Sequence, residues 1–170
     1  FSNIITLSDF LVIYKNKNKN MVGNQYLELV DHIKKILESN EYVNTVLYAR
    51  SNENDLYKKN ITPIAHIIPT GTSWTRGGMR FNFEVGVLDI VNKSNNTSFE
   101  KFDGNDDKID THNATYYVID DLLSKLQYGI DEFVIELGDN ISIQPIFYSG
   151  MNTLDGWMCS FTVTVVKIGC

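Results

Sequence analysis

The stretch Leu154-Asp-Gly-Trp-Met-Cys-Ser-Phe-Thr-Val-Thr-Val-Val166 decides the fold. From Trp157 onward the side chains alternate, and the odd-numbered positions through Val165 are all apolar. A period of two is typical of a strand with one face on the core of a sheet. We expect the segment from Leu154 to Trp157 to turn the backbone and to lead into this long strand.

Further strands are predicted on both sides of this stretch. The strongest is 79–92, in which Phe81, Phe83, Val85 and Val87 share one face. Weaker patterns predict strands at 42–49 and 61–68, where Pro63 is tolerated only near the beginning of a strand or at a sheet edge. Two more strands are expected at 133–137 and 141–148, joined by a turn at 138–140.

Two amphipathic helices are predicted from apolar residues at helical spacing. The first, 24–39, carries the stripe Leu27, Val30, Ile33, Ile36 and Leu37. The second begins at Thr111 or Asn113, ends near 130, and carries Ala114, Val118, Leu122, Leu126 and Ile130. The order is α-β-β-β-α-β-β-β. It predicts an α+β fold, with an antiparallel or mixed sheet of four to six strands and both helices on one face.

Length and composition set the class of protein. The 170 residues fit one domain that can bury a core without disulfides or metals. The formal net charge of −6 argues against binding of nucleic-acid phosphates, which needs a basic surface. We expect Cys159, on the apolar face of the last strand, and the terminal Cys170 to be free thiols.

Residues 1–20 differ from the rest of the chain. An apolar, aperiodic run to Tyr14 is followed by a Lys-Asn stretch, and the patterned sequence begins after Met21. The charges follow the apolar run, unlike those of a secretory signal, and the run is too short to cross a membrane. We interpret 1–20 as a non-native or disordered N-terminal extension and 21–170 as a single α+β domain. The alternative is an ordered arm that packs on a neighbouring subunit.

No motif for catalysis, metal or cofactor binding is complete. His32, His66 and His112 are scattered and lack the spacing of zinc ligands. Asp103, Asn105 and Asp107 match the start of a calcium loop, but Lys108 replaces its glycine, so a mobile acidic loop is the better interpretation.

Other candidate motifs fail in the same way. The glycines at 71–78 precede a strand and lack the ending of a phosphate loop, so a hairpin turn explains them. Cys159 has no histidine nearby in the predicted fold, and Asp120, Asp121, Glu136 and Asp139 are ordinary surface carboxylates of helices and turns. We predict no catalytic residue, no cofactor and no metal, and therefore no enzyme.

Trp74 is the one residue whose position suggests a contact. It lies in the predicted 69–80 hairpin, where small residues precede it and Arg76 and Arg80 follow it. The chain has only one other arginine. Tryptophan and arginine are enriched where proteins bind one another. We predict that Trp74, Arg76 and Arg80 form an interface. The alternative is that Trp74 folds back on its own sheet.

The succession of these segments resembles the tail-terminator and tail-completion proteins of tailed bacteriophages. The resemblance rests on the helix with Tyr26-Leu-Glu-Leu-Val30, the strand Ile61-Thr-Pro-Ile-Ala-His-Ile-Ile-Pro69, the strand Phe81-Asn-Phe-Glu-Val-Gly-Val-Leu-Asp89, a central helix, and Leu154-Asp-Gly-Trp157. It covers 21–168, and it is an order of patterns without a catalytic signature.

The resemblance implies a virion assembly protein with no reaction to catalyse. Subunits of this family form a ring, commonly a hexamer, that closes the tail tube and docks to the neck or head-completion protein. DNA passes through such a ring without specific binding, no membrane is involved, and assembly takes place in the bacterial cytoplasm before the virion is complete. The competing interpretation is a non-viral α+β module that binds a small ligand, or a small enzyme without a recognisable motif.

Overall fold

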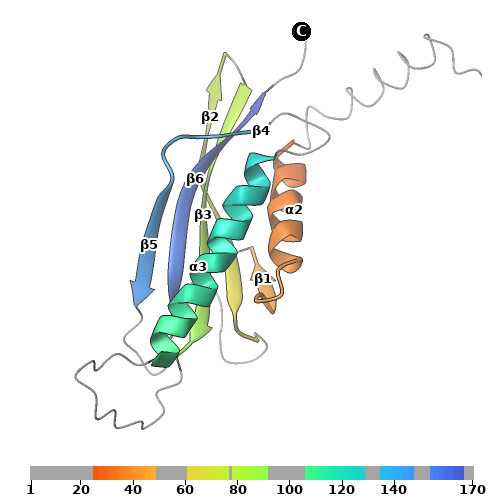
Figure 1. Cartoon of the computed structure of the whole chain (residues 1–170). Helices are drawn as coiled ribbons and strands as arrows, with labels where there is room; N and C mark the ends of the chain where they lie inside the picture. Colours follow the sequence, from red (N-terminus) through yellow and green to blue (C-terminus); the bar gives the residue numbers. More distant parts are fainter. Residues whose placement is uncertain are drawn as a thin grey trace, which may run out of the picture.

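The computed structural model describes residues 25–48, 61–76, 78–91, 106–128, 135–147 and 154–166. These residues form two helices and a mixed sheet of six strands, in the order α-β-β-β-α-β-β-β that the sequence predicts (Figure 1). The helices are α2 (Gln25–Glu38) and α3 (Asp106–Gln127). The strands are β1 (Thr45–Leu47), β2 (Ile64–Thr75), β3 (Gly78–Ile90), β4 (Ile135–Leu137), β5 (Ser142–Phe147) and β6 (Leu154–Val166).

The sheet is organised around β3 and β6, which pair antiparallel over their whole lengths. On one side, β2 forms a hairpin with β3, and the short β1 adds to β2 in parallel. On the other side, β4 and β5 both pair with β6, β4 near its C-terminal end and β5 near its N-terminal end. The described part of the sheet therefore ends at β1 on one edge and at β4 and β5 on the other.

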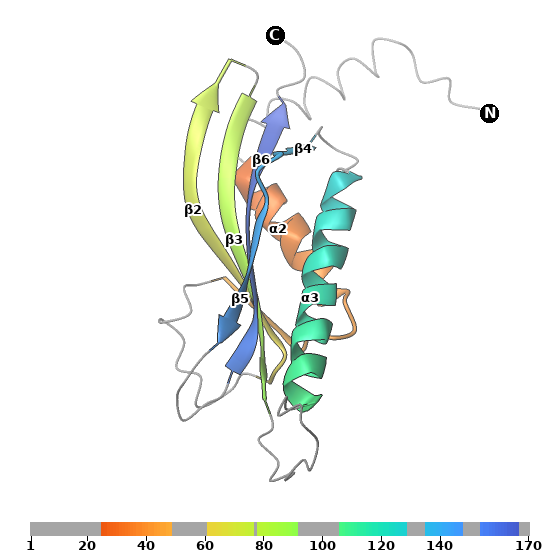
Figure 2. The ribbon, with the colours of Figure 1, turned by 60° about the vertical axis from the view of Figure 1, so that its left-hand side comes forward.

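Both helices lie on the same face of the sheet, as Figure 2 shows. The core lies between them and the sheet, where β3 and β6 contribute their alternating apolar residues. Phe83 stacks with Tyr26 of α2 and packs against Phe161 of β6. The inner faces predicted for these two strands are confirmed, because the odd-numbered residues from Phe81 to Val87 and from Cys159 to Val165 are all buried.

The two helices differ from prediction in their details. Leu27 was expected to be in the buried stripe of α2 but is 65% exposed, whereas Leu29 is fully buried. The contact face of α2 is centred on Leu29, Ile33 and Leu37, and Leu27 lies off that face. Helix α3 begins at Asp106, before the predicted Thr111 or Asn113. The prediction missed this start because the first turns of the helix are mostly polar and carry no apolar stripe. The early aspartates of α3 suit a helix N-terminus, whose dipole favours negative charge.

Two strands are longer than predicted. Strand β2 was expected to end at 68, yet it continues to Thr75, because a register shift between Pro69 and Gly71 lets pairing with β3 resume. The predicted turn before the last strand is also wrong. Leu154 and Gly156 already pair with β3 there, opposite Ile90 and Leu88. The interpretations of 1–20, of the loop residues Asp103 and Asn105, and of Cys170 concern residues outside the described ranges.

Phe83→Ala should strongly destabilise the protein. Phe83 is 1% exposed and lies at the centre of the core, so truncation removes buried surface and leaves a cavity. We expect the free energy of unfolding to fall by about 3–5 kcal/mol. Chemical denaturation followed by circular dichroism measures this change, and a loss below about 1 kcal/mol would show that the core is centred elsewhere.

His32 should make stability depend on pH. Burial lowers the pKa of His32 on α2, and the positive charge of Lys35 lowers it further. The folded state therefore favours the neutral imidazole, and the unfolded state binds more protons as the pH falls below the ordinary histidine value of 6.5. The free energy of unfolding should therefore decrease as the pH falls through that range. The decrease should be smaller for the His32→Gln variant. Identical pH profiles for the variant and the natural sequence would contradict this assignment.

Candidate functional site

The Asp155-Gly156-Trp157 segment of β6 holds the N-terminal half of α3 against the sheet. The indole Nε1 of Trp157 donates a hydrogen bond of 2.9 Å to the backbone oxygen of His112. The rings of Tyr116 and His112 meet the Trp157 ring edge-on, with centroids 5.4 and 5.6 Å away. Such contacts add to the free energy of burial, and the indole N–H finds the partner that a buried tryptophan needs.

Asp155 is a buried carboxylate, 4% exposed. The Nζ atom of Lys108 lies 3.2 Å from Asp155 Oδ2, whereas the Nε2 atom of His112 is 3.8 Å away, too far for a hydrogen bond. The Lys108 ammonium also lies 4.7 Å from the centre of the Phe147 ring. A buried charge needs a partner, and Lys108 provides it while linking α3, β5 and β6.

Gly156 is required by the close approach of β6 to β3. A Cβ atom at this position would lie 1.9 Å from the backbone oxygen of Val87. No side chain fits there without a shift of the backbone. The residue therefore sets the spacing of the two central strands at the point where Asp155 and Trp157 must face α3.

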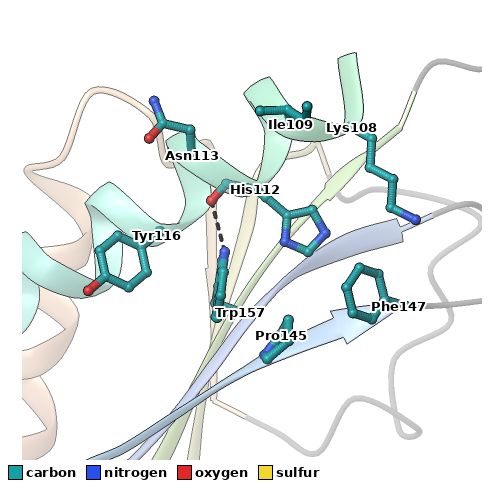
Figure 3. Close-up of a pocket in the computed structure, with 8 residues that line it drawn as sticks. All are labelled: Lys108, Ile109, His112, Asn113, Tyr116, Pro145, Phe147 and Trp157. Atoms are coloured by element: carbon teal, nitrogen blue, oxygen red, sulfur yellow. Dashed lines mark hydrogen bonds between the residues drawn. The ribbon is translucent and has the colours of Figure 1, made fainter. Parts of the chain in front are cut away.

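These contacts surround a pocket of about 490 Å³ between α3 and strands β5 and β6 (Figure 3). We call it the α3–β5 pocket. Its walls are mostly apolar and aromatic, and its main residues are Lys108, His112, Tyr116, Pro145, Phe147 and Trp157. The Nε2 atom of His112 is buried and has no hydrogen-bond partner among the described residues. Because its walls are mostly apolar, the pocket can take an apolar or aromatic group.

The predicted interface residues lie at the other end of the sheet, on the β2–β3 hairpin. Trp74 is 70% exposed, so the alternative in which it folds back on its own sheet is not what the structure shows. Arg76, in the turn, is also exposed. Arg80 lies on the opposite face, because it pairs with Ser73, whereas Trp74 pairs with Met79. The structure thus places Trp74 and Arg76 together at the tip and sets Arg80 apart from Trp74.

Gly78 shapes this tip. It has a φ of 150°, a backbone conformation that residues with a side chain rarely adopt. The Thr75 hydroxyl donates a hydrogen bond of 3.0 Å to the Gly78 backbone oxygen. The turn that presents Trp74 and Arg76 is therefore defined by local chemistry.

The three histidines lie on different elements of the fold. His66 is buried on β2 on the face away from α3, His32 lies on α2, and His112 lines the α3–β5 pocket. In the part of the chain that the structure describes, no group of three or more His, Cys, Asp or Glu side chains could hold a metal ion. Asp107 lies within α3, while Asp103 and Asn105 are outside the described residues.

The carboxylates and the thiol considered from the sequence do not assemble into one site. Asp121 is paired with Lys125 at 2.8 Å and accepts a hydrogen bond from Asn40. Asp120 is exposed on α3, and Glu136 and Asp139 are exposed on or next to β4. Burial raises the pKa of the Cys159 thiol to about 11, so this residue is protonated at neutral pH and is a poor nucleophile.

The sequence was compared with models of known protein families and with curated proteins, and neither comparison finds a match. Neither described helix is long and apolar enough to cross a membrane.

Sequence reasoning missed the α3–β5 pocket. The Asp-Gly-Trp segment is distinctive in the sequence, but a helix predicted to begin at Thr111 or Asn113 leaves Lys108 in a loop. The sequence predicts that Phe147 lies in the 141–148 strand, but it carries no signal that the end of this strand lies beside α3.

Gly156→Ala should destabilise the fold much more than Gly86→Ala. A methyl group at Gly156 meets backbone atoms, whereas one at Gly86 meets only the flexible side chain of Met158 at 3.3 Å. Overpacking of this kind costs typically about 1–3 kcal/mol, and a backbone clash should lie at the upper end. Chemical denaturation of the two variants tests the comparison, and equal losses would contradict the close approach of β3 and β6.

Proposed function

We propose that this chain is a structural subunit that assembles with copies of itself into a ring. As the resemblance described above implies, we further propose that the ring closes the head-proximal end of a phage tail tube and docks to the neck. The observation that carries the proposal is the exposed tryptophan on the β2–β3 hairpin. In Figures 1 and 2 the hairpin extends beyond the ends of both described helices, where a neighbour can reach it.

The chemistry of the hairpin supports a contact between proteins. Trp74 exposes a large apolar ring, and burying such a ring is favourable. Tryptophan and arginine are enriched among the residues that contribute most of the binding free energy at interfaces. The segment 69–80 contains Arg76 and Arg80 and no acidic residue, although the whole chain has a net charge of −6. A basic tip on an acidic subunit favours an acidic surface as its partner.

The overall charge also suits the proposed ring. A ring of acidic subunits would present a negative potential to DNA, and passing DNA would be repelled from its wall. Under this proposal the partners are other copies of the chain, the tail-tube protein and a neck or head-completion protein. The chemistry is that of surface complementarity, and no bond is made or broken.

A second function is favoured by the α3–β5 pocket. Its volume of about 490 Å³ lies within the range of small-molecule sites, about 300–1,000 Å³. A module that binds a small aromatic or apolar ligand would use the same walls. The two functions differ in the expected effect of Trp74→Ala. Binding of a small ligand should not depend on Trp74, whereas assembly of the proposed ring should.

Trp74→Ala should leave the subunit folded and weaken its assembly. Removing a central interface tryptophan typically costs about 2 kcal/mol or more, roughly a thirtyfold loss of affinity. Light scattering measures assembly across a range of protein concentrations, and the length of tubes grown with the tail-tube protein measures termination. Tyr128→Ala is the matched control, because Tyr128 is 91% exposed at the end of α3.

Two results would contradict the proposal. A natural chain that stays monomeric at every concentration and leaves tube length unchanged would exclude a ring-forming terminator. Unfolding of the Trp74→Ala variant would show that Trp74 belongs to the core and not to a contact surface.

A further inference from the structure

Trp74 and the α3–β5 pocket lie at opposite ends of β6. Trp74 pairs with Met79, which pairs with Val165, whereas Trp157 at the pocket lies near the start of the strand. From position 157 to position 165 a strand advances roughly 26 Å, at about 3.3 Å per residue. In Figure 1 the hairpin tip and the N-terminal end of α3 lie at opposite ends of the sheet. One chain therefore cannot place its own Trp74 in its own pocket.

The two features match in shape and polarity. The hairpin offers an exposed indole, and the pocket offers aromatic walls that include Tyr116 and Phe147, both also exposed. An indole is a large ring with mostly apolar surface, and the apolar and aromatic walls of the pocket suit it.

The two features also match in charge. Helix α3 contains five aspartates and two lysines, a net charge of −3. The described structure already engages both lysines, Lys108 with Asp155 and Lys125 with Asp121. Asp107 and Asp110 flank the pocket residues Lys108 and Ile109 in sequence, so acidic residues lie at the pocket end of α3. Attraction of this kind orients two surfaces and weakens as salt is added.

We infer that Trp74 of one copy inserts into the α3–β5 pocket of the next copy, with Arg76 facing the aspartates of α3. The inference rests on the proposed self-assembly and names the two surfaces that make it. Because the surfaces are different, the contact is head to tail. Repetition closes a ring where the rotation between neighbours allows it and otherwise builds a filament.

Mixing two variants tests the inference directly. Trp74→Ala lacks the inserted side chain but keeps the pocket. Ile109→Arg keeps Trp74 but places a positive charge at the pocket, where Ile109 is 50% exposed. Each variant alone should be monomeric, with affinity for itself at least about thirtyfold weaker than that of the natural chain. An equimolar mixture should form a one-to-one dimer and nothing larger, because only one intact contact can form.

The matched control is Ile61→Arg, the same substitution at an isoleucine that is 69% exposed and away from the pocket. It should assemble like the natural chain. Thermal unfolding checks that Ile109→Arg is folded, and Phe147→Ala, at another exposed pocket residue, replaces it if it is not. Size-exclusion chromatography with light scattering gives the mass of every sample.

The possible failures are distinguishable. If the pocket variant assembles like the natural chain, the pocket has another occupant and the inference is wrong, while ring assembly stands. If the mixture stays monomeric, the contact is not between these two different surfaces, and the inference is again wrong. If the natural chain itself never assembles, the proposed function fails together with the inference.

Discussion

Strand β6 is the constraint on which the rest of the structure depends. It is hydrogen-bonded along its whole length to β3 and on its other edge to β4 and β5. Its odd-numbered side chains face the helices and form much of the core. Three consecutive residues at its start, Asp155, Gly156 and Trp157, fix the spacing to β3 and the position of α3. The pocket exists because one strand performs both tasks.

The Lys108–Asp155 pair joins two walls of the pocket, α3 and β6. A buried carboxylate is expensive to desolvate, and a pair of this type is weak evidence for net stability. Its consequence here is geometric: the Lys108 ammonium lies close to both Asp155 Oδ2 and the Phe147 ring, so it links α3 to β6 and β5. A preformed wall of this kind lowers the cost of ordering side chains when a partner binds.

Much of the fold could be predicted from the sequence, because alternation in β3 and β6 and the stripes of the helices are local patterns. The order of elements and the faces of Phe83 and Phe161 follow from such patterns, whereas the sequence leaves open whether Trp74 is exposed or folds back on its own sheet. The start of α3 and the second half of β2 could not be predicted in this way. Polar first turns carry no stripe, and a strand that passes through Pro69 and Gly71 looks like a turn. The pocket was beyond local reasoning, since its residues come from three elements.

The central claim is that Trp74 is exposed in the single subunit and buried in its neighbour after assembly. The chain has two tryptophans, so a sample labelled with fluorotryptophan gives two fluorine resonances, which the Trp74→Ala variant assigns. The measurement is the shift of the Trp74 resonance between H₂O and D₂O, below and above the concentration of assembly. We expect a full solvent shift for Trp74 in the single subunit and its loss in the assembly. A Trp74 resonance that keeps its full solvent shift in the assembly would contradict the account.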